Sequence, residues 1–264
     1  MTHTDPAPPA ASRALDGLNI LITGASSGIG AALAKGVGEA GASAVAVHYN
    51  TGRDGAGEVL GQLTARGVDA AHFQADLSAR GAAEDLVRWV IDRFGRIDVL
   101  INNAGTLVGR RPTPEIDDAY YDAVLDANLY STVACCRAVL PEMIRRRNGT
   151  VINVSSVAAR IGGGSGAALY AAAKGAVSTY TRGLAREVAG YGIRVNAISP
   201  GTIDTPFHER FTSPEALAAV TATIPMGRLG RADEMVGPTV FLASGASSYV
   251  TGQIIEVNGG QYSP

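Results

Sequence analysis

The chain has 264 residues, of which 46% are hydrophobic, and carries a formal net charge of −2 with a pI near 6.1. This near-neutral balance gives no electrostatic reason to expect nucleic acid or an anionic membrane surface as a partner. No stretch approaches the roughly 20 apolar residues that a membrane span needs, and we expect a cytoplasmic protein.

The first segment, residues 1–17, is rich in Pro and Ala and contains no apolar run. This composition predicts a disordered N-terminal tail and is not that of a signal peptide. Residues 18–264 follow without an internal linker or a break in composition, which predicts a single domain.

Short apolar runs then alternate with longer segments of helical periodicity. The predicted strands are 18–23, 43–48, 69–74, 97–102, 150–155, 193–198 and 253–257. The predicted helices are 29–40, 54–66, 80–94, 117–146, 168–190 and 232–243. The strands are mostly continuous apolar runs, as in a parallel sheet that is covered on both faces. The pattern predicts an α/β fold: one doubly wound, seven-stranded parallel sheet with helices on both faces.

The first strand runs into a glycine-rich turn, "TGASSGIG", which contains Gly24, Gly28 and Gly30. The glycines would let the backbone approach a pyrophosphate, with the amides of the following helix as donors. A turn that merely packs tightly would show the same spacing. Ser26 and Ser27 could likewise cap the helix without touching a ligand.

Two further strand ends carry polar residues. Asp76 follows the third strand, where an adenine would lie, although it could equally initiate a helix beside Ser78. Residues 101–105, "INNAG", follow the fourth strand and suit a tight turn next to a cofactor or an ordinary turn.

The only cysteines, Cys135 and Cys136, are adjacent in the predicted helix 117–146. Neighbouring side chains on a helix point apart, which argues against an internal disulfide or a metal pair. We expect two buried, reduced thiols and no metal site.

Tyr170 and Lys174 are one helical turn apart and leave the same face of the helix. Lysine is scarce, because only Lys35 and Lys174 among the 22 basic residues are lysines. An ammonium favours the phenolate and lowers the pKa of a nearby Tyr, which is otherwise about 10. We interpret the pair as an acid–base unit, the alternative being an ordinary surface pair.

With these motifs in this order, the chain resembles the short-chain dehydrogenase/reductase family over residues 18–260. The resemblance rests on "TGASSGIG", Asp76, "NNAG", "LDANLYS", "VINVSS", Tyr170 with Lys174, "SPGTIDT" and "VTGQIIEVNGG". It implies a Rossmann-type fold and hydride transfer between a nicotinamide and a carbonyl or alcohol. Tyr170 would be the general acid or base, and Lys174 would lower its pKa and bind the nicotinamide ribose.

The resemblance implies two more catalytic residues. Ser156 would hydrogen-bond the substrate oxygen; we choose it over Ser155, which should point to the opposite side at the strand end. Asn128 would hold a water that links Lys174 to solvent, although a helical Asn can also simply bond a neighbouring backbone.

The cofactor would lie along the carboxyl edge of the sheet. The predicted cofactor-binding residues are Gly24, Ser26, Ser27, Gly28, Ile29, Gly30, Asn50, Arg53, Asp76, Leu77, Asn103, Ala104, Gly105, Tyr170, Lys174, Pro200, Gly201, Ile203 and Thr205. The second strand ends in the neutral Tyr49, where an acidic residue would hold a ribose hydroxyl. Asn50, Thr51 and Arg53 could together receive a phosphate there, unless Arg53 is only a solvated residue of the first helical turn, so we predict a preference for NADP(H) over NAD(H).

Three loops should hold the substrate, and we predict Arg110, Arg111, Ser156 and His208 as its contacts. Their polar character resembles reductases of uronate-derived keto-aldehydes and related sugar-acid dehydrogenases. We therefore expect a small polar carbonyl compound whose carboxylate is gripped by an Arg of the 110–111 pair, unless these charges form a solvated rim. Thr106 departs from that narrower group, in which a Gly is expected.

Several alternatives remain. One is a 3-oxoacyl-(acyl-carrier-protein) reductase, and another is a catalytically silent, cofactor-binding regulator. An epimerase or dehydratase is a third, although such relatives usually carry a longer C-terminal region. The family also implies a homotetramer that packs through the predicted helices 117–146 and 168–190.

Overall fold

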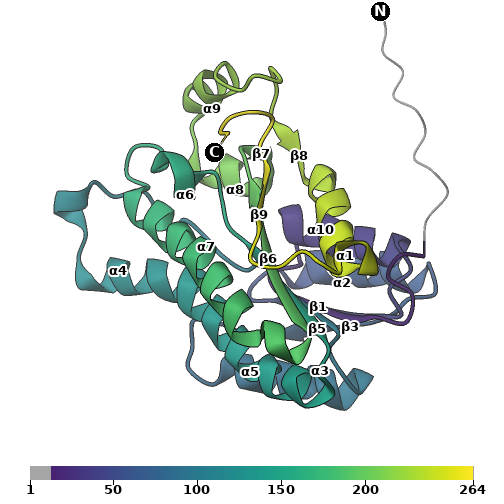
Figure 1. Cartoon of the computed structure of the whole chain (residues 1–264). Coiled ribbons are helices and arrows are strands. Elements are labelled where there is room, and N and C mark those ends of the chain that lie inside the picture. The colour runs from purple at the N-terminus through teal and green to yellow at the C-terminus, as the bar shows by residue number, and fades with distance from the viewer. Residues whose placement is uncertain (1–12, 264) are drawn as a thin grey trace, which may run out of the picture.

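A computed structural model describes residues 13–263 (Figure 1). Its centre is a seven-stranded parallel sheet with the order β3-β2-β1-β4-β5-β6-β9. The strands are β1 (Asn19–Ile22), β2 (Ala44–Tyr49), β3 (Asp69–Gln74), β4 (Val99–Asn102), β5 (Gly149–Val154), β6 (Ile193–Pro200) and β9 (Ile254–Val257). The order reverses beside β1, so a crevice for a ligand opens between β1 and β4. The predicted doubly wound sheet is confirmed.

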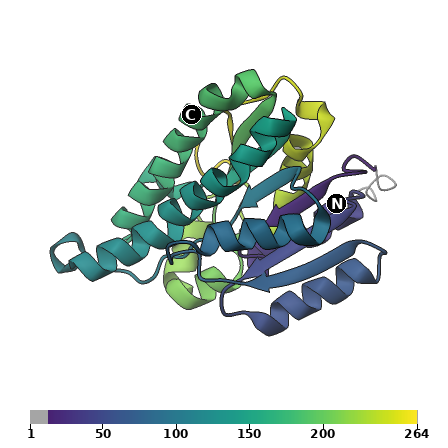
Figure 2. The ribbon, with the colours of Figure 1, turned by 90° about the horizontal axis from the view of Figure 1, so that it is seen from below.

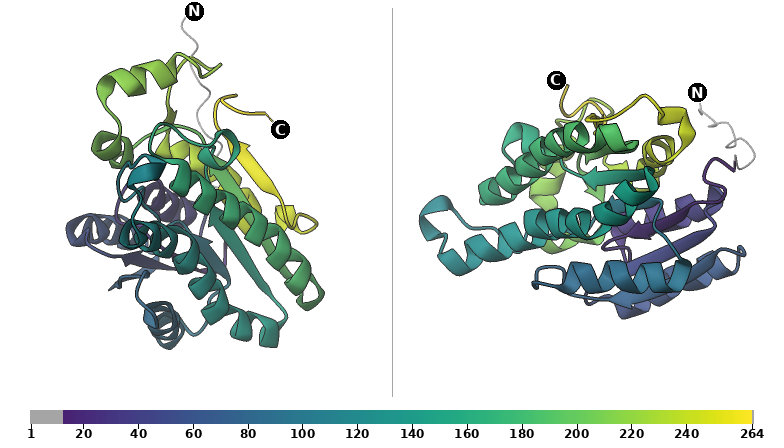
Figure 3. Two further views of the ribbon diagram at one scale, coloured as in Figure 1. Left: turned by 90° about the vertical axis from the view of Figure 1, so that its left-hand side faces the viewer. Right: turned by 60° about the horizontal axis from the view of Figure 1, so that its bottom comes forward.

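Helices cover both faces of the sheet, as the views of Figures 2 and 3 show. One layer contains α1 (Gly28–Glu39), α2 (Arg53–Thr64) and α10 (Val236–Ala243). The other contains α3 (Ala82–Phe94), α5 (Ser131–Arg146) and α7 (Ala168–Val188). Successive residues of a strand pack into the hydrophobic clusters on opposite faces of the sheet. In β1, Ile20 and Ile22 face the first helix layer, and Leu21 faces the second.

The predicted helix 117–146 is α4 (Asp118–Leu125), a π-helical turn (Asp126–Tyr130) and α5 in one continuous segment. By length and composition this segment could cross a membrane, and 44% of its most apolar window is buried against the rest of the protein. Cys135 and Cys136 are buried within the sheet core, as free thiols. This is the arrangement of a core helix.

Several short elements were not predicted, and most surround the carboxyl edge of the sheet. They are α6 (Ala158–Ile161), α8 (Pro206–Phe211), α9 (Pro214–Thr221), a small sheet of β7 (Ile203–Asp204) and β8 (Gly230–Arg231), and the 3-10 turns Thr113–Glu115 and Gly245–Ser247. Two further 3-10 turns, Ala189–Tyr191 and Ala232–Met235, form the end of the predicted helix 168–190 and the start of the predicted helix 232–243. We call residues 206–221, which hold α8 and α9, the lid.

The predicted disorder of the tail is wrong for its last residues. Leu15 is fully buried in the core beside α1, and the N–H of Gly17 donates to the Ser43 hydroxyl at 2.9 Å. The apolar Leu15 side chain is what ties this segment down. The rest of the predicted tail, residues 1–12, lies outside the described residues.

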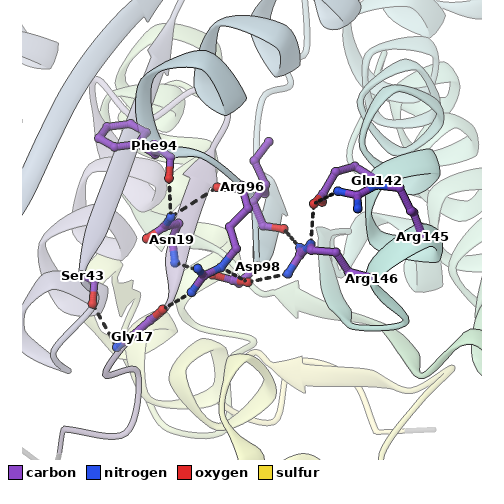
Figure 4. A network of polar contacts seen from close by, with 10 residues as sticks. Gly17, Asn19, Ser43, Phe94, Arg96, Asp98, Glu142, Arg145 and Arg146 are labelled. Atoms are coloured by element: carbon purple, nitrogen blue, oxygen red, sulfur yellow. Dashed lines mark hydrogen bonds and ion pairs between the residues drawn. The ribbon is translucent and has the colours of Figure 1, made fainter.

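An ionic network closes the opposite edge of the sheet, below the amino ends of β1 and β4 (Figure 4). The Asp98 carboxylate is only 5% exposed and accepts bonds from the Asn19 N–H, Arg96 Nε and Arg146 Nη1, each at 2.9 Å. It thereby joins two strands to α5 at the edge remote from the crevice.

Candidate active site

A cavity of about 380 Å³ lies at the carboxyl ends of the strands. The glycine-rich turn, the end of β5, the first turns of α7 and the lid line it. This is the place where open α/β sheets bind ligands. Among the described residues, no group of His, Cys, Asp and Glu side chains is placed to hold a metal ion.

Tyr170, Lys174 and Ser156 meet at one wall of this cavity. The first two lie on successive turns of α7, and the Lys174 Nζ is 5.9 Å from the centroid of the Tyr170 ring. Nζ donates to the Val154 carbonyl at 2.9 Å, which fixes the ammonium at the end of β5. The alternative of a surface pair does not apply, because Lys174 is only 4% exposed.

Desolvation dominates the acid–base balance of the pair. Burial lowers the pKa of Lys174 to about 8, and burial raises the pKa of Tyr170 to about 12, while the hydrogen bond with Ser156 lowers it. Lys174 is not among the groups that shift the pKa of Tyr170 in the protein alone, so the lowering by Lys174 that the sequence predicts stays a prediction. At neutral pH Tyr170 is a protonated phenol, the form that donates a proton.

The two adjacent serines have separate environments. Ser156 lies beside Tyr170, and its oxygen accepts a bond from the Ala158 N–H at 3.1 Å. Ser155 is buried, and its oxygen is 2.6 Å from that of Ser178. Both hydroxyl oxygens also lie near the Lys174 carbonyl, at 3.1 and 3.2 Å, so one hydroxyl can donate to this carbonyl while the other donates to its neighbour. Ser155 and Ser178 thus anchor α7 to β5, a role that only packing reveals.

Asn128 is fully buried in the π-helical turn, beside the end of β4. Its Nδ2 donates to the carbonyls of Thr106 and Val124, and its Oδ1 accepts from the Thr106 N–H at 3.2 Å. A Cβ on Gly105 would lie 2.7 Å from Asn128 Oδ1 and 3.1 Å from Lys174 Nζ. Asn128 therefore holds the loop after β4 against Lys174 through its backbone bonds, while its relay role stays a prediction.

The glycine-rich turn packs too tightly for side chains. A Cβ on Gly30 would lie 2.2 Å from the Gly24 carbonyl, and one on Gly24 would lie 2.9 Å from Ala104 Cα. Asn103 Nδ2 donates to the Thr23 and Gly24 carbonyls, which closes the turn from the β4 side. Helix α1 begins at Gly28, and its N-cap Ser27 makes no side-chain cap bond. Free amides facing a cavity suit a pyrophosphate.

His48 is a residue of this site that sequence reasoning missed. Its Nδ1 accepts from the Gly24 N–H at 3.1 Å, and its Nε2 lies 3.0 Å from the Ala75 carbonyl. Burial lowers the pKa of His48 to about 4. The neutral ring therefore ties the glycine-rich turn to the segment before Asp76. A lone His in a buried strand beside the turn was the available signal.

The predicted adenosine-binding residues lie at the far end of the turn. Asn50 and Arg53 are exposed at the end of β2 and the start of α2, outside the main cavity. A Cβ on Gly55 would lie 2.2 Å from the Ser26 carbonyl, so this part of α2 packs on the turn. Asp76 Oδ1 accepts from the N–H and hydroxyl of Ser78, as a helix-initiating residue does.

The remaining predicted cofactor contacts divide between the cavity and its surroundings. Leu77 is buried in the core, so its side chain faces away from the cavity. Residues that line the cavity from the glycine-rich turn, β6 and the following loop are Ile29, Pro200, Gly201, Ile203 and Thr205.

Only some of the predicted substrate residues line the cavity. Arg110 and His208 line the cavity. Arg111 does not, because its guanidinium pairs with Asp117 at 2.8 Å and lies 4.7 Å from the centroid of the Tyr120 ring. The expectation of a substrate contact at Arg111 is therefore corrected: successive residues of this extended loop point in opposite directions. Phe207, Leu217 and Val220 of the lid also line the cavity and were missed.

Comparisons with known proteins agree with this geometry. Residues 24–262 match the family described as enoyl-(acyl carrier protein) reductase. The 2-dehydro-3-deoxy-D-gluconate 5-dehydrogenase of Pseudoalteromonas atlantica is 40% identical over 93% of this chain and 96% of its own. The 3-oxoacyl-(acyl-carrier-protein) reductase FabG of Staphylococcus aureus is 38% identical over 92% of this chain and 97% of its own.

Solved structures give the same result. An NADH-dependent reductase responsible for alginate metabolism superposes with a TM-score of 0.87, at 38% identity, over 96% of this chain and 100% of its own. A putative NAD(P)-dependent gluconate 5-dehydrogenase from Beutenbergia cavernae with bound NADP also gives 0.87, at 38% identity, over 94% of this chain and 98% of its own.

The fold and site define a nicotinamide-dependent oxidoreductase with a Rossmann-type sheet. The chain belongs to the short-chain dehydrogenase/reductase family.

Proposed function

We propose that the protein transfers a hydride between NADP(H) and a small polar carbonyl or alcohol, a sugar acid or a keto-aldehyde. The observation that carries the proposal is the meeting of Tyr170, Ser156 and Lys174 at the wall of a cavity that continues to the glycine-rich turn. A silent regulator would have no need to keep these groups and Asn128 together.

The bound nicotinamide would supply or accept the hydride. During reduction the Tyr170 hydroxyl donates its proton to the carbonyl oxygen, while Ser156 hydrogen-bonds the same oxygen as charge develops on it. Lys174, with its pKa of about 8, still carries a positive charge at neutral pH and stabilises the phenolate that remains.

The substrate class is supported by the polar residues Arg110 and His208 in the cavity and by the sugar-acid dehydrogenases among the similar proteins. The second candidate is reduction of a 3-oxoacyl thioester. Leu217 and Val220 favour it, because they give the lid an apolar wall, and so does the FabG relative.

The test is the absorbance of NADPH with the purified protein across keto-deoxy sugar acids, uronate-derived keto-aldehydes and 3-oxoacyl thioesters. We expect turnover of a sugar-derived carbonyl. Tyr170→Phe is the matched control and should lower kcat by about 10²–10⁴-fold without weakening cofactor binding. Cofactor binding without turnover of any carbonyl compound would contradict the proposal and favour the regulator.

We also propose the preference for NADP(H). The neutral Tyr49 ends β2, and the exposed Arg53 opens α2 beside the glycine-rich turn. Arg53→Ala should raise KM for NADPH about tenfold, as expected for a lost charged hydrogen bond, and leave KM for NADH unchanged. Arg66→Ala, beyond the other end of α2, is the control. A higher kcat/KM with NADH in the unaltered protein would overturn this preference.

Residues 18–264 are proposed to act as one domain in a cytoplasmic homotetramer, with a small molecule as the partner and without nucleic acid or membrane partners. The half-buried segment Asp118–Arg146 and helix α7 would pack between subunits. Light scattering of the purified protein tests the assembly, and a monomer would contradict it.

A further inference from the structure

Arg110 joins three segments that surround the substrate side of the cavity. Its Nε donates to the Phe211 carbonyl at 2.7 Å, its Nη1 to the Ser165 carbonyl at 2.9 Å and its Nη2 to the Thr212 hydroxyl at 3.4 Å. The first bond also places a cation at the carboxyl end of α8, where the helix dipole favours it. Much of the donor capacity of Arg110 therefore serves the lid and the glycine-rich loop before α7.

The Thr212 hydroxyl connects Arg110 to His208. Its oxygen lies 3.1 Å from His208 Nδ1 and 3.4 Å from Arg110 Nη2. An Arg can only donate, so the Thr212 oxygen accepts and its own hydrogen is free for Nδ1. No other acceptor for that hydrogen occurs among the described side-chain contacts of Thr212.

The surroundings keep the imidazole uncharged. Burial and the nearby Arg110 charge lower the pKa of His208, against a smaller opposite effect of Asp204. A neutral ring whose Nδ1 accepts from Thr212 carries its proton on Nε2. Within the described part of the chain, Nε2 has no hydrogen-bond partner, and the side chain lines the cavity.

We propose that the relay Arg110–Thr212–His208 fixes His208 as an Nε2–H donor that recognises an uncharged oxygen of the substrate. The inference rests on the proposed function and narrows its substrate class to hydroxylated carbonyl compounds. The Phe207 ring lies between the two groups, with its centroid 6.0 Å from that of the Tyr170 ring and 5.3 Å from that of the His208 ring. The oxygen recognised by His208 is therefore not the carbonyl oxygen that reacts at Tyr170. Thr212 and Arg110 are positioning residues, and His208 is the specificity-determining one.

The first test compares aldehydes of equal length with and without hydroxyl groups: glyceraldehyde with propanal, and erythrose with butanal. Thr212→Val removes only the hydroxyl of the relay and should lower the preference for the hydroxylated partner, the ratio of the two kcat/KM values, about tenfold. Thr212→Ser should restore the preference. Thr64→Val is the matched control, because that hydroxyl bonds the Leu60 and Gly61 carbonyls within α2 and does not line the cavity.

The second test needs no turnover. Long-range proton–nitrogen NMR of the full chain labelled in histidine, with His208→Asn to assign the signal, should show His208 with Nδ1 unprotonated and Nε2 protonated. Thr212→Val should disturb this pattern, and Thr212→Ser should retain it.

A parallel loss on both aldehydes of each pair, an unchanged preference in Thr212→Val, or an Nδ1–H or doubly protonated His208 would overturn the relay. If the unaltered protein reduces neither these aldehydes nor any carbonyl compound of the panel described under the proposed function, the proposed function fails instead, and the NMR result alone decides the relay.

Discussion

The His48 ring accepts a hydrogen bond from the backbone N–H of Gly24 at 3.1 Å, so a buried side chain of β2 holds the glycine-rich turn from below. The same ring contacts the Ala75 carbonyl through Nε2. One neutral imidazole thus spans the loops after β1 and β3, which lie on either side of β2 in the sheet.

This contact predicts acid sensitivity. His48 has a pKa of about 4 in the folded protein and about 6.5 when unfolded, so the unfolded chain binds the additional proton between these values. Stability should therefore fall by about 3 kcal/mol as the pH drops from 6.5 to 4. In His48→Asn that loss should be absent, although the variant is less stable at pH 7 because the Ala75 contact is lost.

Urea unfolding of both proteins at pH 7 and pH 4.5 measures the effect. Equal pH dependence of the two unfolding free energies would mean that His48 is not the group responsible.

Lys174 should make the folding stability depend on pH in the alkaline range. Its pKa is about 8 when folded and about 10.5 when unfolded, so Lys174 itself should add stability to the cofactor-free protein as the pH rises from 8 to 10.5. This gain is measured as the unfolding free energy of the unaltered protein minus that of Lys174→Met, because the buried Cys135 and Cys136 thiols, whose pKa values are raised, lower the stability of both proteins above pH 9. Lys174→Met removes the buried cation and should be more stable at pH 7 by up to about 3 kcal/mol, while losing most of its activity. Thermal melting across this range tests it; a variant that melts lower at every pH would refute the expectation.

The ionic network below the sheet should contribute to stability without touching catalysis. Asp98→Asn keeps the shape of the side chain but removes one of the two carboxylates that pair with the partly buried Arg146, the other being Glu142, and should cost about 2 kcal/mol. Asp85→Asn is the control, because its pair with Arg88 is exposed and worth less than about 1 kcal/mol. Denaturant midpoints together with KM for NADPH separate the two effects; a raised KM in Asp98→Asn would contradict a purely structural role.

Most of the strands were predictable because they are apolar runs long enough to be buried on both faces, as Ala44–Tyr49 illustrates with six buried residues. The edge strands β3 and β9 contain no buried residue and were predictable only from their place in the alternation of strands and helices. The two lid helices α8 and α9 were not predictable. They are short, and none of their residues belongs to the buried hydrophobic clusters of the described structure. The burial of Leu15 was not predicted for a related reason. A single apolar residue gives no periodicity, and only the core next to it explains its burial.

The residues of the candidate active site also fall into those that the sequence predicts and those that it does not. Tyr170, Lys174 and the glycines were predictable because their spacing follows from helix and turn geometry. The opposite directions of Arg110 and Arg111 depend on where Asp117 and the lid lie in space, which no local pattern contains. His48 and Ser178 act through contacts between strands and helices far apart in the chain.

The depth of Lys174 has a practical consequence for chemical labelling. Acylating dyes need an accessible amine, and the two lysine side chains differ sharply: Lys174 is 4% exposed and bonded to Val154, whereas Lys35 is partly exposed on α1. Between these two side chains, an activated ester should therefore react at Lys35. A fluorophore or surface tether attached there leaves the wall of Tyr170 and Ser156 unmodified, because Lys35 instead lines a second cavity, beside Ser26 and Ser27 of the glycine-rich turn.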